Sequence, residues 1–278
     1  MTPLRLLGLI VTALSLTACA HVDGTGRAQM LLLTTPAEEN RLGAEAYAEV
    51  RKTEKICTDP EANALVRRVG QRLAAAAPDK GFTYEFVVLE SPTVNAFCLP
   101  GGKVAVYTGI LPWCGNEAAL ATVLGHEIGH AIARHGGERM NQGEMAQLGG
   151  QTLSAVLQLK GVDPTTTNLS MAAFGLGSQI GVLLPFSRTQ ELEADYLGLT
   201  YMAKAGYDPH EAVLFWQRFG ALTSSSGTPG FLSTHPASAD RAKQLAEKMP
   251  EAERLYNAAP EKFGKGATVP AKYLTPVK

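Results

Sequence analysis

The sequence of 278 residues is poor in charged side chains and has no excess of either sign. Charged residues make up 18% of the chain, against an average of about 25%. Lys and Arg number 25 against 26 Asp and Glu, so there is no electrostatic basis for binding nucleic acid or for a polybasic membrane patch. Those partners are excluded, whereas a hydrophobic content of 45% predicts a folded globular protein.

The chain also lacks an apolar run long enough to cross a bilayer, which needs about 20 residues. Residues 1–5 carry one positive charge and residues 6–16 form a short apolar run, the layout of a secretory signal. The sequence Leu-Thr-Ala-Cys ending at Cys19 resembles the lipobox of bacterial lipoproteins, in which the cysteine becomes the lipidated first residue. We therefore expect a signal peptide over residues 1–18 and a tether over residues 19–35.

Ala20 follows the cysteine, and by resemblance to enteric lipoproteins this predicts anchoring at the periplasmic side of the bacterial outer membrane. A soluble exported protein is the alternative. Cys57, Cys98 and Cys114 remain, an odd number in a compartment that oxidises thiols. They allow at most one internal disulfide, whose pairing the sequence leaves open, and three buried free cysteines are an equal alternative.

Hydrophobic periodicity predicts one continuous, mostly helical α+β domain over residues 36–258, followed by a tail over residues 259–278. A small β-sheet, with strands at residues 82–89 and 103–110 joined through Gly101-Gly102, precedes the most apolar helix, which Asn116 can cap. The other expected elements are helices at 36–55 and 60–77, a helical hairpin at 140–184, a helix from its cap at Ser187 to Gly206, one starting at Asp208, and one at 239–249.

His126, Glu127 and His130 form an H-E-x-x-H motif inside that apolar helix. Four residues at about 100° each return the two imidazoles to one face, one turn apart, so both can bind the same zinc ion. Glu127 lies beside them as a general base for a water molecule at the metal. Two unliganded histidines and a glutamate in a core would be costly to bury. The motif therefore predicts one zinc ion per chain.

A catalytic zinc needs a third protein ligand and one open position. His135 stands one residue short of the third histidine of the metzincin pattern, and we interpret it as an ordinary histidine at a helix end. The acidic cluster Glu191, Glu193 and Asp195 offers better ligands. If Glu191 is the ligand, Asp195 shares its helix face and can accept the free N–H of a zinc-bound histidine.

Four segments resemble the CaaX prenyl protease and Oma-type family of zinc metallopeptidases, over most of residues 30–250. They are LGHEIGHAIARH around the motif, NAFCLPGG from Asn95, SRTQELEADYLG from Ser187, and His235-Pro236 before Arg241. The exported lipoproteins and the β-barrel assembly-enhancing proteases of this family are nearest in layout. The resemblance implies a zincin-type fold with Glu127 as base and Glu191 as third zinc ligand. It also implies that Asp195 is the carboxylate that accepts a hydrogen bond from a zinc-bound histidine.

Peptide hydrolysis also requires a site that binds the peptide and a donor that stabilises the oxyanion. An extended peptide must cross the zinc, and an edge strand at Asn95 and Ala96 can hold it by main-chain pairing, although these residues can equally form a strand-to-turn corner. The oxyanion needs a donor, for which His235 and Arg241 are the candidates. His235 can instead fill the open zinc position of a resting enzyme, and Arg241 can serve only to orient the loop.

We therefore expect a zinc endopeptidase of the gluzincin type that acts on unfolded or misassembled envelope proteins, in envelope protein quality control. A periplasmic chaperone or assembly-scaffold lipoprotein with a structural zinc is the alternative from another class. A zinc-dependent amidase or small-molecule hydrolase is a weaker third possibility, because the sequence contains no indication of a closed pocket for a small ligand.

Overall fold

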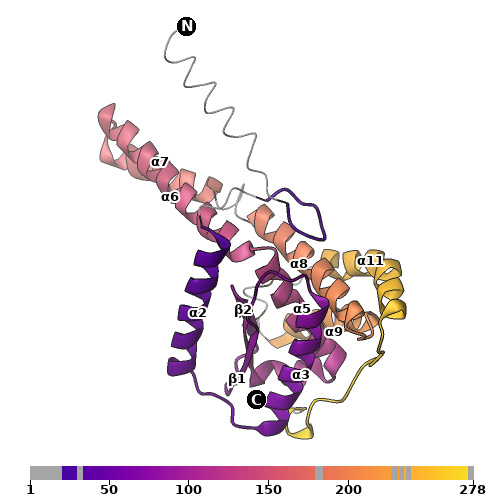
Figure 1. Cartoon of the computed structure of the whole chain (residues 1–278). Helices are drawn as coiled ribbons and strands as arrows, with labels where there is room; N and C mark the ends of the chain where they lie inside the picture. Colours follow the sequence, from indigo (N-terminus) through magenta and orange to yellow (C-terminus); the bar gives the residue numbers. More distant parts are fainter. Residues whose placement is uncertain are drawn as a thin grey trace.

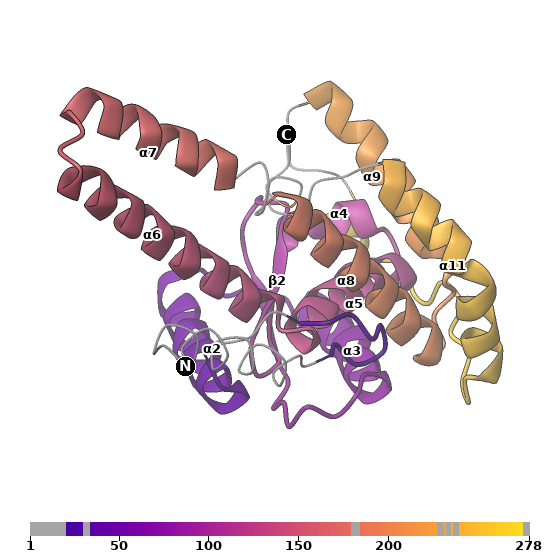
Figure 2. The same cartoon turned by 90° about the horizontal axis from the view of Figure 1, so that it is seen from above.

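The computed structural model describes residues 21–29, 34–178, 184–226, 231, 235 and 239–274. The expected signal peptide and the lipidation site at Cys19 lie outside these residues, as does part of the expected tether. Figures 1 and 2 show a body of helices around a small sheet, with a helical hairpin extending from it.

Helix α5 (Glu117–Ile132) is the centre of the body, and every residue in it is buried. It begins where predicted, because the side chain of Asn116 accepts a hydrogen bond from the main-chain N–H of Ala119. Helices α3 (Pro60–Ala76) and α8 (Leu184–Lys204) pack against it. A helix that is apolar on all sides needs such cover, so the H-E-x-x-H motif lies in the core.

A small sheet lies beside α5 and has the strand order β1-β3-β2. Strand β1 (Glu85–Leu89) runs parallel to β3 (Lys103–Tyr107), and β2 (Ala96–Leu99) runs antiparallel to β3. The turn between β2 and β3 contains Gly101 and Gly102 at φ of 81° and 80°, a conformation that favours glycine. The predicted small sheet is confirmed, and β2 is an edge strand. The turn, however, joins β2 to β3 rather than the strands predicted at residues 82–89 and 103–110, and residues 108–110 form a 3₁₀ helix instead of the end of a strand.

Helices α6 (His135–Leu159) and α7 (Pro164–Ser178) form the expected hairpin, which projects from the body (Figures 1 and 2). The hairpin starts five residues earlier than the predicted boundary at Met140. Among the helices of the described residues, none is both long enough and apolar enough to cross a bilayer.

Two further predicted helix ends are wrong. Helix α8 begins at Leu184 rather than after a cap at Ser187, because Pro185 is well suited to the first turn of a helix. Helix α11 (Ala239–Ala258) continues through Pro250, where the prediction had ended it. Proline removes one main-chain hydrogen bond, but the buried Ala252 keeps the second half of α11 against the body. The remaining elements are α2 (Pro36–Thr53), η1 (Thr108–Ile110), α4 (Leu111–Cys114), α9 (His210–Ser226) and η3 (Ala271–Tyr273).

Both described ends of the chain pack against the body. Residues 21–29 bury Val22, which is 4% exposed, and this segment is part of the expected tether. At the other end, the carbonyl of Lys265 accepts a hydrogen bond from the N–H of Ala118 at 3.0 Å. Tyr273 donates its hydroxyl to Asp59 Oδ2 at 2.7 Å. The domain boundaries at residues 36 and 258 stay predictions.

Candidate metal centre

Helices α5 and α8 come into close contact through glycine. A Cβ added to Gly198 would lie 2.7 Å from the main-chain carbonyl carbon of Gly125 and from the main-chain nitrogen of His126. A Cβ added to Gly129 would lie 3.0 Å from the carbonyl oxygen of Ala194. Side chains at these positions would push the helices apart, so the glycines bring the H-E-x-x-H motif against the acidic cluster of α8.

Four buried side chains direct one donor atom each to a common point. They are His126 and His130 from α5, Glu191 from α8, and His235, and their donor atoms all lie within 4.8 Å of one another. His126 Nε2 is 3.0 Å from His130 Nε2 and 3.1 Å from His235 Nδ1. Glu191 Oε2 is 3.2 Å from His126 Nε2 and 3.0 Å from His235 Nδ1. His126, His130 and Glu191 are the three predicted ligands. His235 lies where the alternative prediction placed it, at the fourth position of the zinc.

The spacing of these atoms fits a tetrahedral zinc ion. Zinc bonds of about 2.0–2.1 Å to nitrogen place neighbouring ligand atoms about 3.3 Å apart, close to the separations of 3.0–3.3 Å seen here. The set of imidazoles and one carboxylate is one that zinc prefers. Beside it, Glu127 Oε1 is buried and has no hydrogen-bond partner among the described residues. The residues present therefore fit a zinc site with a carboxyl group next to it that is not one of the four converging donors.

Asp195 and Arg241 hold His126 in place. His126 Nδ1 lies 2.9 Å from Asp195 Oδ1, and Arg241 donates to both oxygens of that carboxylate, from Nε at 2.6 Å and Nη2 at 2.7 Å. The Arg241 guanidinium also lies 3.7 Å above the ring of Trp216. Burial opposes charge on His126, but the contact with Asp195 outweighs it and raises the pKa of His126 to about 9. Asp195 is thus the partner of a histidine, as predicted. Arg241 supports Asp195 and also contacts two members of the site, since its Nη1 lies 3.5 Å from Glu191 Oε2 and 3.4 Å from the main-chain oxygen of His235.

The two glutamates of the site have opposite pKa shifts. Burial alone would raise the pKa of Glu191, but hydrogen bonds with His126, His130 and His235 lower it far below its usual value. Burial raises the pKa of Glu127, and the nearby imidazoles only partly offset this rise. Glu191 is therefore the ionised carboxylate suited to a metal ligand, whereas Glu127 is the carboxyl group suited to exchanging a proton.

His135 is a member of the site that the sequence analysis missed. The sequence predicts an ordinary histidine at the end of a helix, but the side chain of His135 is fully buried and its Nδ1 lies 2.7 Å from His130 Nδ1. The reason is the left-handed backbone conformation of Arg134, whose φ is 55°. This left-handed residue ends the run of the motif helix and begins α6, so that His135 folds back onto His130. Helical periodicity gives no indication of such a turn.

A cavity of about 250 Å³ opens beside these residues. Asn95 and Ala96 line it together with Glu127, His130 and His235. Ala96 is the first residue of β2, whose outer edge is not paired within the described sheet. The predicted edge-strand residues are thus brought to the same cavity as the motif.

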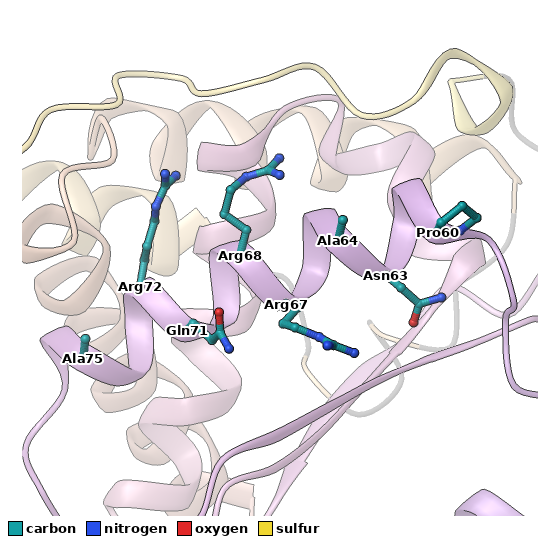
Figure 3. Close-up of a pocket in the computed structure, with 8 residues that line it drawn as sticks. All are labelled: Pro60, Asn63, Ala64, Arg67, Arg68, Gln71, Arg72 and Ala75. Carbon is teal, nitrogen blue, oxygen red and sulfur yellow. The ribbon is translucent and has the colours of Figure 1, made fainter.

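Another cavity, of about 660 Å³, lies along the outer face of α3. Figure 3 shows Arg68 and Arg72 extending from α3 on the same side, with Arg67 on the other. Arg68 and Arg72 are ion-paired with Glu117, so they hold α3 to the start of α5. None of the eight lining residues is a histidine, cysteine or carboxylate, and this cavity has no metal-binding chemistry.

An H-E-x-x-H helix beside a small sheet, with a glutamate from a second helix, defines a zincin-type metallopeptidase of the gluzincin class. The sequence profile of peptidase family M48 matches residues 60–249. Mitochondrial metalloendopeptidase OMA1 of Schizosaccharomyces pombe is 38% identical over 77% of this chain and 62% of its own length. Metalloendopeptidase OMA1, mitochondrial, of Danio rerio is 34% identical over 89% of this chain and 54% of its own length. A protein of Vibrio cholerae named putative beta-barrel assembly-enhancing protease is 30% identical over 77% of this chain and 45% of its own length.

The chain belongs to peptidase family M48, as these matches show. Members of this family use zinc, which agrees with the geometry of the four donor atoms. The resemblance inferred from the motifs is confirmed, as is the expected fold. The chain spans between about a third and two thirds of the length of the first relatives it matches.

Proposed function

We propose that this protein is a zinc metalloendopeptidase that hydrolyses peptide bonds in exported proteins, with unfolded or misassembled envelope proteins as its substrates. One observation carries the proposal, the position of Glu127. Its buried Oε1 makes no hydrogen bond within the described residues and lies beside four converging zinc donors. Glu127 also lines the cavity that residues of the edge strand β2 line. A structural zinc site has no need of a buried carboxyl group that neither binds the metal nor makes a hydrogen bond through this oxygen.

Each residue has a distinct part in this reaction. His126, His130 and Glu191 hold zinc, which when bound supplies a Lewis acid that polarises the scissile carbonyl and activates water. Glu127 accepts the proton of the attacking water and returns it to the leaving amine. Ala96, at the start of β2, and Asn95, just before it, line the cavity and align an extended peptide along the open edge of this strand.

The position of His235 bears on whether the zinc site is catalytic or structural. Four protein ligands are typical of a closed structural zinc site, whereas catalysis needs one position for substrate and water. The close approach of His235 Nδ1 to the other donors therefore supports the chaperone or scaffold alternative. For a peptidase, His235 has to leave the fourth position when a peptide binds, and its other nitrogen, now 3.4 Å from Glu127 Oε1, then becomes a donor for the oxyanion.

Removal and return of zinc test the proposed activity. Here and in the experiments below, the mature chain is used without its lipid-bearing Cys19 and so starts at residue 20. It is incubated with casein as an unfolded substrate before chelation, after chelation and after addition of one equivalent of zinc. We expect fragments to form only when zinc is present. Cleavage that continues in fully chelated protein would contradict a zinc endopeptidase.

The proposed location depends on Cys19. We propose a lipid anchor at this residue, on the periplasmic side of the bacterial outer membrane, which would bring the cavity to envelope substrates. Labelled palmitate should enter the wild-type protein in cells but not the Cys19→Ala variant. Equal labelling of both would refute the anchor without affecting the proposed chemistry.

A further inference from the structure

A series of hydrogen-bonded polar side chains connects Nδ1 of His130 to the N-terminal segment, residues 21–29. Its members on the helices are buried, and those on the segment are partly buried. His130 Nδ1 lies 2.7 Å from His135 Nδ1, and His135 Nε2 lies 2.9 Å from Glu193 Oε2. Arg27 donates from Nε to the same Glu193 oxygen at 2.7 Å, and Thr25 donates its hydroxyl to the other oxygen. His135 is fully buried and Glu193 is 7% exposed.

The hydrogen bonds along this series require one arrangement of protons. A neutral histidine that gives Nε2 to a metal carries its proton on Nδ1. His130 therefore donates from Nδ1, and His135 must accept on its own Nδ1 and carry its proton on Nε2. That proton is donated to Glu193, so a carboxylate two residues from the zinc ligand Glu191 determines which nitrogen of His130 faces the metal.

Arg27, at the other end of this series of hydrogen bonds, is also fixed by a second carboxylate. Arg27 donates from Nη1 and Nη2 to the two oxygens of Glu138, at 3.1 and 2.9 Å, and Glu138 is fully buried. The guanidinium is thus fixed between two carboxylates of different helices, α6 and α8. Arg139 Nη2 also lies 3.5 Å from His130 Nδ1, but this distance is at the limit of a hydrogen bond.

We propose that His135, Glu193 and Arg27 are positioning residues that fix the tautomer and the orientation of His130 as a zinc ligand. Asp195 orients His126 through a direct hydrogen bond, whereas Glu193 orients His130 through the imidazole of His135. The segment that follows the expected lipidation site is then part of the zinc site, because it supplies the cation that holds Glu193. The inference rests on the proposed zinc site but not on peptide cleavage.

Zinc affinity and the visible spectrum of the cobalt-substituted protein test the proposal without any activity measurement. Affinity is measured by competition with a chromophoric chelator for the mature wild type and for two variants of His135. Glutamine can accept at one atom and donate at another about as far apart as the two ring nitrogens, so His135→Gln should stay close to wild type. His135→Leu removes both functions and should bind zinc about 10 to 100 times more weakly, with shifted cobalt bands.

Glu193→Gln and Arg27→Met probe the same series from its far end. Both should weaken zinc binding and shift the cobalt bands, with a smaller effect for Arg27→Met because His135 keeps its carboxylate partner. The matched control is Glu117→Gln, which removes a buried carboxylate paired with arginines at the start of α5. It should lower the melting temperature but leave zinc affinity and the cobalt spectrum unchanged.

The outcomes separate this inference from the proposed function. Wild-type zinc affinity and an unchanged spectrum in both His135→Leu and Glu193→Gln would overturn the positioning role while leaving the zinc site intact. An equal loss of affinity in Glu117→Gln would also overturn it, because the effect would then be general destabilisation. A wild-type protein that binds no zinc would overturn both.

Discussion

The carboxylate of Asp195 connects the buried Arg241 to the zinc-binding residue His126. Arg241 is 2% exposed and donates two hydrogen bonds to Asp195, which in turn accepts from His126 Nδ1. A buried guanidinium left without its carboxylate would cost several kcal/mol. The three side chains therefore stabilise one another and set the direction of the His126 ring.

Asp195→Asn should lower zinc affinity by about 10 to 100-fold, because an amide cannot pair equally well with both Arg241 and His126. Chelator competition measures this loss. Glu211→Gln is the control, since Glu211 is 1% exposed and paired with Arg218 on α9, outside the metal site. Unchanged affinity in Asp195→Asn would show that Asp195 does not orient the ligand.

At the residue scale, helical spacing predicted the central part of the site. His126 and His130 are four residues apart, as are Glu191 and Asp195, and one helix face contains each pair. His135 was not predictable in this way, because its contact with His130 depends on the single left-handed residue Arg134. A residue outside the regular helix leaves no trace in a periodic pattern.

At the scale of elements, the contact between α5 and α8 is what assembles the metal centre. The two helices meet at Gly125 and Gly198 with main chain against main chain. The zinc ligands lie within about one or two turns of this contact on both helices. The distance between the helices therefore sets the distance between the histidines and Glu191.

Gly198→Ala should destabilise the protein by about 1–3 kcal/mol and weaken zinc binding, because the new Cβ would lie 2.7 Å from the main chain of α5. Thermal unfolding and chelator competition measure the two effects. The control is Gly220→Ala on α9, where an added Cβ has nothing within 4 Å, so alanine should be neutral or stabilising. If Gly198→Ala is as stable as wild type and binds zinc normally, the close contact is not required.

The prediction of elements succeeded where a local residue marks a boundary and failed where signals compete. Thr35 accepts a hydrogen bond from the N–H of Glu38 at the start of α2, as its capping pattern indicates. At α8, Ser187 gave a similar signal, but the helix begins at Leu184. The turn at Gly101-Gly102 was predictable from its glycines. The strand that this turn joins to β3 was not, because the more β-branched residues 82–89 were expected to lead into it, whereas β2 does.

At the scale of the whole molecule, the structure decides the state of the cysteines that the sequence left open. Cys57, Cys98 and Cys114 are all free. Cys57 and Cys114 are 4% and 1% exposed, and burial raises the pKa of Cys114 to about 12. A thiol with such a pKa stays protonated near neutral pH, so it is a poor nucleophile and resists oxidation.

The mature chain should therefore show three titratable thiols when unfolded without reductant. In the folded protein at pH 8, Cys114 should stay unmodified by iodoacetamide, and it should react only once unfolding exposes it and returns its pKa to the ordinary range. Mass spectrometry of the alkylated protein locates each modified cysteine. A single titratable thiol after unfolding would reveal a disulfide and contradict the structure.

The central claim is that Glu127 makes this zinc site an enzyme. The most direct measurement compares the mature wild type with its Glu127→Gln variant, recording bound zinc and the rate of casein cleavage in the same samples. We predict one zinc per chain in both proteins and cleavage by the wild type alone, with loss of activity of at least about 100-fold in the variant. Equal cleavage by both proteins, or no cleavage by either with zinc fully bound, would contradict the account and favour a structural zinc in a scaffold protein.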